Sequence, residues 1–417
     1  MQDGGLQNHR IRYTVVLRPV AKIAGLNLLE LIKSKNESIQ EVEACLRQLQ
    51  TASAEIDFAL PPRLRLHHFG GAAAFVQLLA TWSRKCGAAK LIVDFDRTDP
   101  NPVQQLFGRT LPGTAAGLLV DPSRIANLDG TKIEYPKSPS EIAVEELMLR
   151  GTERTGPRLW LLCADHTTLE KPTSIYGSDG RVSLPALRFA LSKFFSRPAP
   201  SSRGQTSPND LRECASSVLF ELLQNTHEWA RTDWNNEVLN KSVRGTLIHA
   251  YATHEVPEDI ANGTVGAPLI ASYYQSFPNR LAMIEVSVFD CGPGLASRFL
   301  RKPLDKMTVA EEFDAIKRCL RLRGTSSDIE HKGLGLHRIL RLLTRQRGII
   351  RIRAGRLSLF RNLLAQPLTE EDSYELHDEK TGTTPSVPWP PVTGTLVTAI
   401  MPLDGHDPAQ GKLWEGK

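Results

Sequence analysis

The first half of the chain alternates between apolar runs typical of buried strands and apolar spacings typical of helices. The pattern predicts a strand at 11–17, a helix over 27–51, a strand at 64–69, a helix over 72–86 and a strand at 90–95. The last three elements fall within roughly thirty residues, and a pair of glycines separates the strand from the helix. This order indicates a βαβ unit and a parallel sheet.

The middle of the chain has a weaker pattern, because Pro-rich and Gly-rich pieces alternate with short apolar runs between 96 and 156. A helix over 140–149, a buried strand at 158–163 and a helix over 184–195 are predicted. The next segment is rich in Pro, Ser and Gly and has no apolar period. We therefore place a domain boundary at 198–206.

The second half has clear apolar periods at both helical and strand spacing. We expect a loop at 255–279 and a long mobile loop at 360–395, which carries several prolines. The predicted elements are, in chain order, a helix that starts at Ser207 or Asn209 and reaches Trp229, strands at 245–251 and 281–289, helices at 310–321 and 335–344, and strands at 349–353, 356–360 and 395–401.

The length of 417 residues allows two or three domains, and the patterns together predict an α/β protein. The predicted parts are an N-terminal α/β domain at 1–197 that also divides into subregions 1–61 and 62–197, a linker at 198–206, a second domain at 207–403 and a tail at 404–417.

The composition is that of an ordinary globular protein, and a net charge of +5 points to no particular partner. The start of the chain has no signal-peptide pattern, and no apolar run is long enough to span a bilayer. The 6 cysteines are scattered without a C-x-x-C pair, which favours reduced thiols over disulfides or a zinc site. We expect a cytoplasmic protein without membrane contact.

Candidate chemistry begins in the helix that reaches Trp229. Glu221, Asn225 and Glu228 stand at positions i, i+4 and i+7, so they share one face of this helix. Apolar residues on the neighbouring arc predict that the helix packs on a sheet. The pattern fits a helix that points a carboxylate and a carboxamide into a pocket, and it also fits an ordinary amphipathic helix with a solvated acidic edge.

Three glycine motifs follow this helix, namely Asp290-Cys291-Gly292-Pro293-Gly294, Gly333-Leu334-Gly335-Leu336 and Gly394-Thr395. The first follows a predicted strand, the second opens a helix and the third leads into the last strand. Helix and motifs together resemble the Bergerat-fold (GHKL) ATPases: gyrase-type ATPase subunits, MutL proteins, ninety-kilodalton heat-shock chaperones, histidine kinases and anti-sigma kinases. The resemblance covers about half of the chain, from Pro208 to Leu403, and implies a sandwich of a mixed sheet with helices on one face.

The resemblance implies a site for ATP and Mg²⁺. At its adenine end, Asp290 accepts a hydrogen bond from the exocyclic amine, and the glycines that follow let the base approach closely. At its phosphate end, Gly333 and Gly335 present backbone N–H groups at the positive end of a helix. The implied ligand contacts are Asn225, Glu228, Asp290, Gly292, Gly294, Ser326, Lys332, Gly333, Leu334, Gly335, Leu336 and Thr395.

Several of these positions have subsidiary roles. Lys332 would reach a terminal phosphate, although a solvated lysine fits equally well, and Ser326 lies in a Gly-Thr-Ser-Ser segment that resembles the family's lid edge. Thr395 would support the carboxylate that binds adenine. Glu228 would act through water near the adenine, or it is a solvated helix residue. Where the family often has a further glycine this chain has His331, which predicts a different loop shape.

Glu221 and Asn225 carry the chemistry in this interpretation. Mg²⁺ prefers oxygen ligands and usually keeps several waters, so the carboxamide oxygen of Asn225 beside the phosphates is a sufficient protein ligand. One helical turn earlier, Glu221 would act as general base for the attacking water. The resemblance gives this glutamate that role in the ATPases, whereas in the kinases it assists the phosphoacceptor.

An arginine-rich stretch at 338–361 follows the second glycine motif. It fits a solvated face, and it also fits a surface for an acidic partner or for nucleic acid. Its arginines are Arg338, Arg341, Arg345, Arg347, Arg351, Arg353, Arg356 and Arg361.

The preferred hypothesis is a Mg²⁺-dependent ATP-binding protein that hydrolyses ATP and acts as a nucleotide-operated switch towards a protein partner or a second copy of itself. The sequence shows neither a transducer domain after Leu403 nor a helical hairpin with a phosphoacceptor histidine. This compactness leaves an anti-sigma-type serine/threonine kinase as the alternative. A nucleic-acid-associated ATPase that uses the arginine-rich stretch is a further alternative.

Overall fold

The computed structural model describes residues 28–30, 39–52, 55–60, 69–93, 95, 102–127, 133, 148–149, 158–165, 175–178, 180–195, 208–253, 256, 268–277, 282–321, 335–369 and 374–403. The predicted strand at 11–17, the linker at 198–206 and the tail at 404–417 lie outside these residues.

A small parallel sheet forms in the N-terminal part, as the βαβ pattern predicts, but the strand before the helix at 71–85 lies at 57–60, and most of the predicted strand at 64–69 lies outside the described residues. Its first strand corrects the helix predicted over 27–51, because the described helix begins only at Ile39. Across the sheet, the strands are β1 (Leu28–Glu30), β2 (Asp57–Leu60), β3 (Leu91–Val93) and β4 (Ile125–Asn127). The helices of this part are α1 (Ile39–Thr51), α2 (Gly71–Lys85), α3 (Pro102–Arg109) and α4 (Leu111–Leu119), with a 3₁₀ turn η1 at Pro122–Arg124.

The second sheet is larger, and all its neighbouring strands are antiparallel, so the predicted mixed sheet is wrong. Tight hairpins such as the turn at Gly355 between β9 and β10 require this direction. Strands β5 and β6 also join it, so the sheet extends across the predicted boundary at 198–206. Across the sheet, the eight strands are β11 (His377–Asp378), β10 (Leu357–Asn362), β9 (Ile349–Gly355), β12 (Val392–Pro402), β8 (Ala282–Asp290), β7 (Val243–Ala252), β6 (Arg158–Ala164) and β5 (Met148–Leu149).

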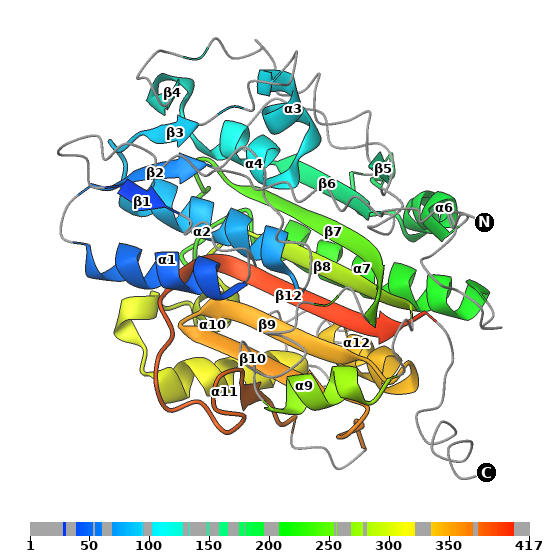
Figure 1. The fold of residues 1–417 in the computed structure, drawn as a ribbon. Helices are drawn as coiled ribbons and strands as arrows, with labels where there is room; N and C mark the ends of the chain where they lie inside the picture. The colour runs from blue at the N-terminus through cyan, green and yellow to red at the C-terminus, as the bar shows by residue number, and fades with distance from the viewer. Residues whose placement is uncertain are drawn as a thin grey trace, which may run out of the picture.

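Helices cover both faces of this sheet, which corrects the prediction of helices on one face. Figure 1 shows α2 in front of β12 and β8, with α7 and α12 behind them. The segment predicted as a loop at 255–279 contains α9, which packs beside β10. The remaining helices are α6 (Leu184–Phe195), α7 (Pro208–Trp229), α9 (Pro268–Gln275), α10 (Leu295–Leu300), the 3₁₀ turn η3 (Leu304–Lys306), α11 (Val309–Leu320) and α12 (Gly335–Arg345).

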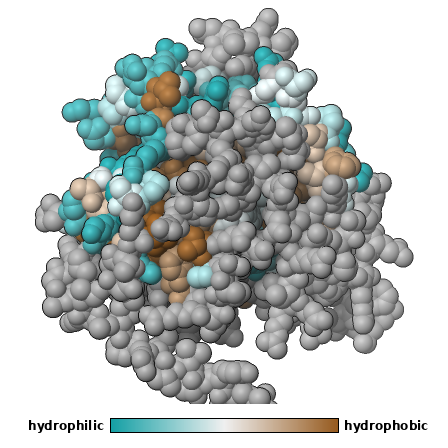
Figure 2. All heavy atoms as spheres, turned by 90° about the horizontal axis from the view of Figure 1, so that it is seen from above, coloured by the Kyte–Doolittle hydropathy of each residue, from teal (hydrophilic) through white to brown (hydrophobic). Residues whose placement is uncertain are grey.

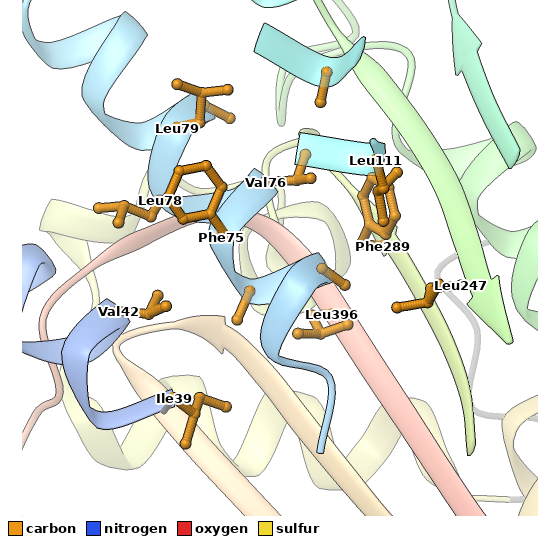
Figure 3. Packing of buried hydrophobic residues seen from close by; sticks show 14 of the residues in the cluster. Ile39, Val42, Phe75, Val76, Leu78, Leu79, Leu111, Leu247, Phe289 and Leu396 are labelled. Atoms are coloured by element: carbon orange, nitrogen blue, oxygen red, sulfur yellow. The ribbon is translucent and has the colours of Figure 1, made fainter. Parts of the chain in front are cut away.

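The two faces have separate hydrophobic cores. On the face of α2, Val76 belongs to one cluster with Leu247, Phe289 and Leu396 from β7, β8 and β12 (Figure 3). On the opposite face, side chains of α7 and α12 form a second cluster with alternate residues of the same strands. Burial of each large apolar side chain contributes about 2 kcal/mol, so both helical layers hold the sheet.

Part of the segment predicted as a mobile loop at 360–395 is tied to the sheet instead. Glu379 is buried and accepts a hydrogen bond of 2.8 Å from Nε of Arg351. Trp389 donates its indole N–H to Oδ2 of Asp378 over 2.6 Å. Polar and aromatic anchors of this kind leave no regular apolar period, which is why the pattern predicted a loop.

The N-terminal part is joined to the large sheet through a buried carboxylate. Glu285 of β8 accepts backbone N–H bonds from Phe69 at 2.6 Å and Gly70 at 2.8 Å, directly before α2. Ser287 donates its hydroxyl to the same carboxylate over 3.1 Å. Gly70 has a φ of 76°, and a Cβ there would lie 2.4 Å from Oγ1 of Thr398, so glycine is required at this approach.

Among the described residues, no helix combines the length and hydrophobicity that a membrane crossing needs. Figure 2 looks down on the molecule from above and shows hydrophobic residues near the middle of that face and hydrophilic residues towards its upper left edge. Large exposed apolar side chains are few among the described residues, and Phe189 of α6 is one of them.

The buried carboxylate predicts a pH dependence of stability. Burial raises the pKa of Glu285 from 4.5 to about 7, against the effect of its hydrogen bonds and of Arg351. Because the pKa of Glu285 is higher in the folded state than its ordinary value, the folded state holds this proton more tightly than the unfolded chain does. The stability gained from the protonated group is complete below pH 4.5 and is lost as the pH rises through 7. We expect the free energy of unfolding of the wild type to fall by about 2 kcal/mol between pH 5 and pH 8 from this group.

Urea unfolding of Glu285→Gln at both pH values checks this expectation. The variant has no ionisable group at this position, so its slope with pH should be flatter. Glu237→Gln, at an exposed glutamate, is the matched control and should keep the wild-type slope. An unchanged slope in Glu285→Gln would contradict the assignment.

Candidate functional site

Helix α7 brings a carboxylate and a carboxamide to the start of α12. Gly335, the first residue of α12, lies so close that a Cβ there would be 2.9 Å from Oε2 of Glu221 and 3.7 Å from Nδ2 of Asn225. One turn further along α12, Arg338 donates to Oε1 of Glu221 over 3.0 Å. The predicted base, the predicted magnesium ligand and the positive end of a helix therefore meet.

Asp290 ends β8 on the same face of the sheet and is 7% exposed. Its Oδ1 accepts backbone N–H bonds from Gly292 at 2.8 Å and Thr395 at 3.2 Å. Within the described part of the chain no hydrogen bond reaches Oδ2. Burial raises the pKa of Asp290 to about 6, while the two N–H groups and the charges of Arg84 and Arg244 act in the opposite direction. The site thus has one carboxylate oxygen, Oδ2 of Asp290, to which no described residue donates.

The glycines around Asp290 are required by close approaches. Gly394 has a φ of 75°, and a Cβ there would lie 1.9 Å from the carbonyl oxygen of Asp290. Gly292 touches the end of α7, since its Cβ would lie 2.8 Å from Cα of Ala230. Gly294 has a φ of 86° and faces the carbonyl of Gly394. The first and third glycine motifs therefore pack against each other and against α7.

The candidate site is elongated along α7. Its first end lies at Glu221 and Asn225 beside Gly335, and its second end lies at Ala230 beside Gly292. Nine residues of α-helix separate Glu221 from Ala230, which corresponds to about 13 Å. The two ends differ in chemistry, because one offers a helix N-terminus with polar side chains and the other offers a buried carboxylate next to backbone turns.

Other predicted contacts are placed differently or lie outside the described residues. Glu228 is half-buried and accepts a hydrogen bond of 2.8 Å from Gln224, its neighbour on α7. Leu336 is 8% exposed and belongs to the hydrophobic core between α12 and the sheet. The predicted phosphate contacts that lie outside the described residues are Ser326, Lys332, Gly333 and Leu334.

Sequence patterns did not predict the ion pairs around the site. The ion pair of Arg338 with Glu221 joins residues far apart in the chain, and only the helical phase of Arg338 after the glycine motif hints at it. Arg244 of β7 forms a bidentate pair with Asp165 at 2.8 and 2.9 Å and also contacts the hydroxyl of Tyr176. No local signal predicts that pair, because β6 and β7 are brought together only by the sheet.

The arginine-rich stretch does not form one exposed face. Arg351, Arg353 and Arg361 are 1–3% exposed, and the first two pair with the buried glutamates Glu379 and Glu43. The interpretation of 351–361 as a solvated face or a nucleic-acid surface is therefore wrong for these three. Glu43 belongs to the N-terminal part and Glu379 to the segment at 374–395, whereas Arg361 donates to the carbonyls of Gln366 and Pro367. The exposed arginines of α12 are Arg338, Arg341 and Arg345.

No family model, curated protein or solved structure matches this chain. In the described part of the chain, no three His, Cys, Asp or Glu side chains gather as metal ligands.

The close approach of Gly394 to the backbone of Asp290 predicts how a substitution there changes stability. Gly394→Ala places a methyl group on the backbone of Asp290 at a positive φ, where neither partner can move easily. We expect a loss of about 3 kcal/mol or failure to fold, measured by thermal and urea unfolding. Gly87→Ala, where the added Cβ meets nothing within 4 Å, is the control and should stay near the wild type. Equal stability of the two variants would show that the two motifs do not touch.

Proposed function

We propose that this chain binds and hydrolyses ATP with Mg²⁺ in an elongated pocket along α7, in an arrangement of the Bergerat type. The observation that carries the proposal is the convergence of the motif segments. Gly335 lies against Glu221 and Asn225, while Asp290, Gly292 and the start of β12 meet at the other end of the same helix. These segments are far apart in the sequence, and an elongated ligand with a base and phosphates matches the chemistry of the two ends.

The base end supports recognition of adenine. Asp290 holds Oδ1 in two backbone hydrogen bonds, so its orientation is fixed before any ligand arrives. Oδ2 then accepts from the exocyclic amine of adenine, which guanine does not present at the same position. The missing Cβ atoms at Gly292 and Gly294 let Ala230 and the carbonyl of Gly394 approach the backbone beside this carboxylate, which fixes the shape of the base-binding end. This geometry favours ATP over GTP.

The phosphate end supports binding of Mg²⁺-ATP. Gly335 fits a phosphate-binding position, because any side chain there would displace the Glu221 carboxylate. The start of α12 also turns its backbone N–H groups towards the same space. Asn225 would hold the ion through its carboxamide oxygen, with water completing the shell. When bound, Mg²⁺ would neutralise part of the negative charge of the phosphates.

The position of Glu221 supports hydrolysis. Its carboxylate takes a proton from water while the water oxygen forms a bond to the γ-phosphorus and the bond from phosphorus to the β,γ-bridging oxygen breaks. Arg338 holds Oε1 over 3.0 Å and leaves Oε2, the atom nearest to Gly335, for the water. The side chain of Arg338 is 54% exposed, so the pair can open as the site fills. We propose that this change operates a switch towards a protein partner or a second copy.

The first test compares Glu221→Ala and Asn225→Ala with the wild type. We expect Glu221→Ala to bind ATP with wild-type affinity while phosphate release falls by at least about 100-fold, because only the base is lost. Asn225→Ala should lose Mg²⁺-dependent binding. Arg341→Ala, an exposed arginine of α12, is the control. If the wild type binds no ATP, the proposal fails, and if γ-label appears on a co-purified protein instead of as free phosphate, the kinase alternative replaces hydrolysis.

The second test uses pH. The carboxylate form of Asp290 is the acceptor, and its pKa of about 6 means that ATP affinity should fall by about tenfold from pH 7.5 to pH 5 beyond any change due to the nucleotide itself. Asp290→Asn should bind more weakly throughout and lack this step. Calorimetry of both proteins across the range measures the difference, which removes the titration of ATP. Parallel curves would remove Asp290 from base recognition.

A further inference from the structure

We infer that α2 of the N-terminal part positions the base-binding end of the pocket from the opposite face of the sheet. The inference rests on the proposed function for the identity of the ligand. The contacts that support it join α2 to the two backbone segments that hold Asp290. They come from one polar stripe on α2, because Gln77, Thr81 and Arg84 stand at i, i+4 and i+7.

The first contact holds the start of β12, where the pairing register shifts between Val392 and Thr395. The backbone N–H of Thr393 donates to Oγ1 of Thr81 over 2.9 Å. Gln77 donates its amide to the carbonyl of Arg353 at 3.2 Å and to that of Thr393 at 3.5 Å. Thr393 and Gly394 lead directly to Thr395, whose N–H binds Asp290. Movement of Thr393 would therefore shift the N–H group that binds the Asp290 carboxylate.

The second contact holds the turn after β8. Arg84 donates Nη2 to the carbonyl of Cys291 over 2.5 Å. Cys291 lies between Asp290 and Gly292, whose N–H is the other donor to Oδ1. The side chain of Cys291 is fully buried in the core that α2 shares with the sheet. Each of the two backbone donors to Asp290 is thus one or two residues along the chain from a residue that is hydrogen-bonded to a side chain of α2.

Helix α2 is itself fixed in place. Its N-terminal end is bound by the carboxylate of Glu285, and its apolar side is buried against β7, β8 and β12. It also connects β2 to β3 of the small parallel sheet. Thr81 and Arg84 are therefore held at fixed positions against the two backbone segments beside Asp290. Thr81 and Arg84 are positioning residues, because neither touches the ligand.

The experiment uses the full-length chain with Thr81→Ala and Arg84→Ala. Lys85→Ala is the matched control, since Lys85 is the next residue on α2 and donates to the carbonyls of Leu49 and Gln50, away from the large sheet. Two readouts are taken, namely the amide hydrogen exchange of Gly292 and Thr395 and the affinities for ATP and for inorganic tripolyphosphate. Thr81→Ser restores the hydroxyl and tests for rescue.

We expect Thr81→Ala and Arg84→Ala to exchange the two amides about tenfold faster and to bind ATP about tenfold more weakly, with tripolyphosphate binding unchanged. Lys85→Ala and Thr81→Ser should match the wild type. Unchanged exchange in Thr81→Ala and Arg84→Ala overturns the inference. If the wild type binds no ATP, the proposed function fails, and the exchange rates alone still decide whether α2 positions Asp290.

Discussion

Burial of the Glu285 carboxylate beneath α2 is the interaction on which the arrangement of the two parts depends. A carboxylate in the centre of a sheet is costly unless hydrogen bonds replace its water. Here the replacement comes from Phe69 and Gly70, which precede α2, and from Ser287 on the same strand. Separation of the N-terminal part would expose this group together with a large apolar surface. The N-terminal part is therefore a structural layer of the large sheet.

Strand β8 connects the buried Glu285 to the candidate site, because the same strand ends at Asp290. Its residues alternate between the faces, so Glu285 and Phe289 turn towards α2 while Val286 and Val288 turn towards the core under α7. Asp290 continues the second series and ends the strand at the site. A strand buried on both faces has little freedom to shift, because closely packed interiors transmit displacement. The position of Asp290 is thus set by packing on both sides of the sheet.

Buried ion pairs complete the contact between the layers. Arg353 of β9 binds Glu43 of α1 at 2.8 Å and also donates to the carbonyl of Pro390 at 2.6 Å. Arg351 lies over the ring of Phe69 and pairs with Glu379. Such pairs add little net stability, since desolvation of both charges offsets their attraction, but loss of one partner is costly. They favour one placement of α1, α2 and the 374–395 segment over alternatives that would leave a charge unpaired.

The sequence by itself determined the local elements of the second half and the order of its motifs. The predicted helix to Trp229 matches α7 (Pro208–Trp229), and the predicted strand at 281–289 matches β8 (Ala282–Asp290) within a residue, because apolar period is a local property. The i, i+4 relation of Glu221 and Asn225 follows from helix geometry alone. Only the tertiary structure decided which strands are neighbours, that both faces of the sheet are covered, and that Arg353 is internal. Its partner Glu43 lies 310 residues away in the chain. A period shows which side of an element is apolar. It does not show which segment packs on the other side, because that depends on contacts between segments that have no common local pattern.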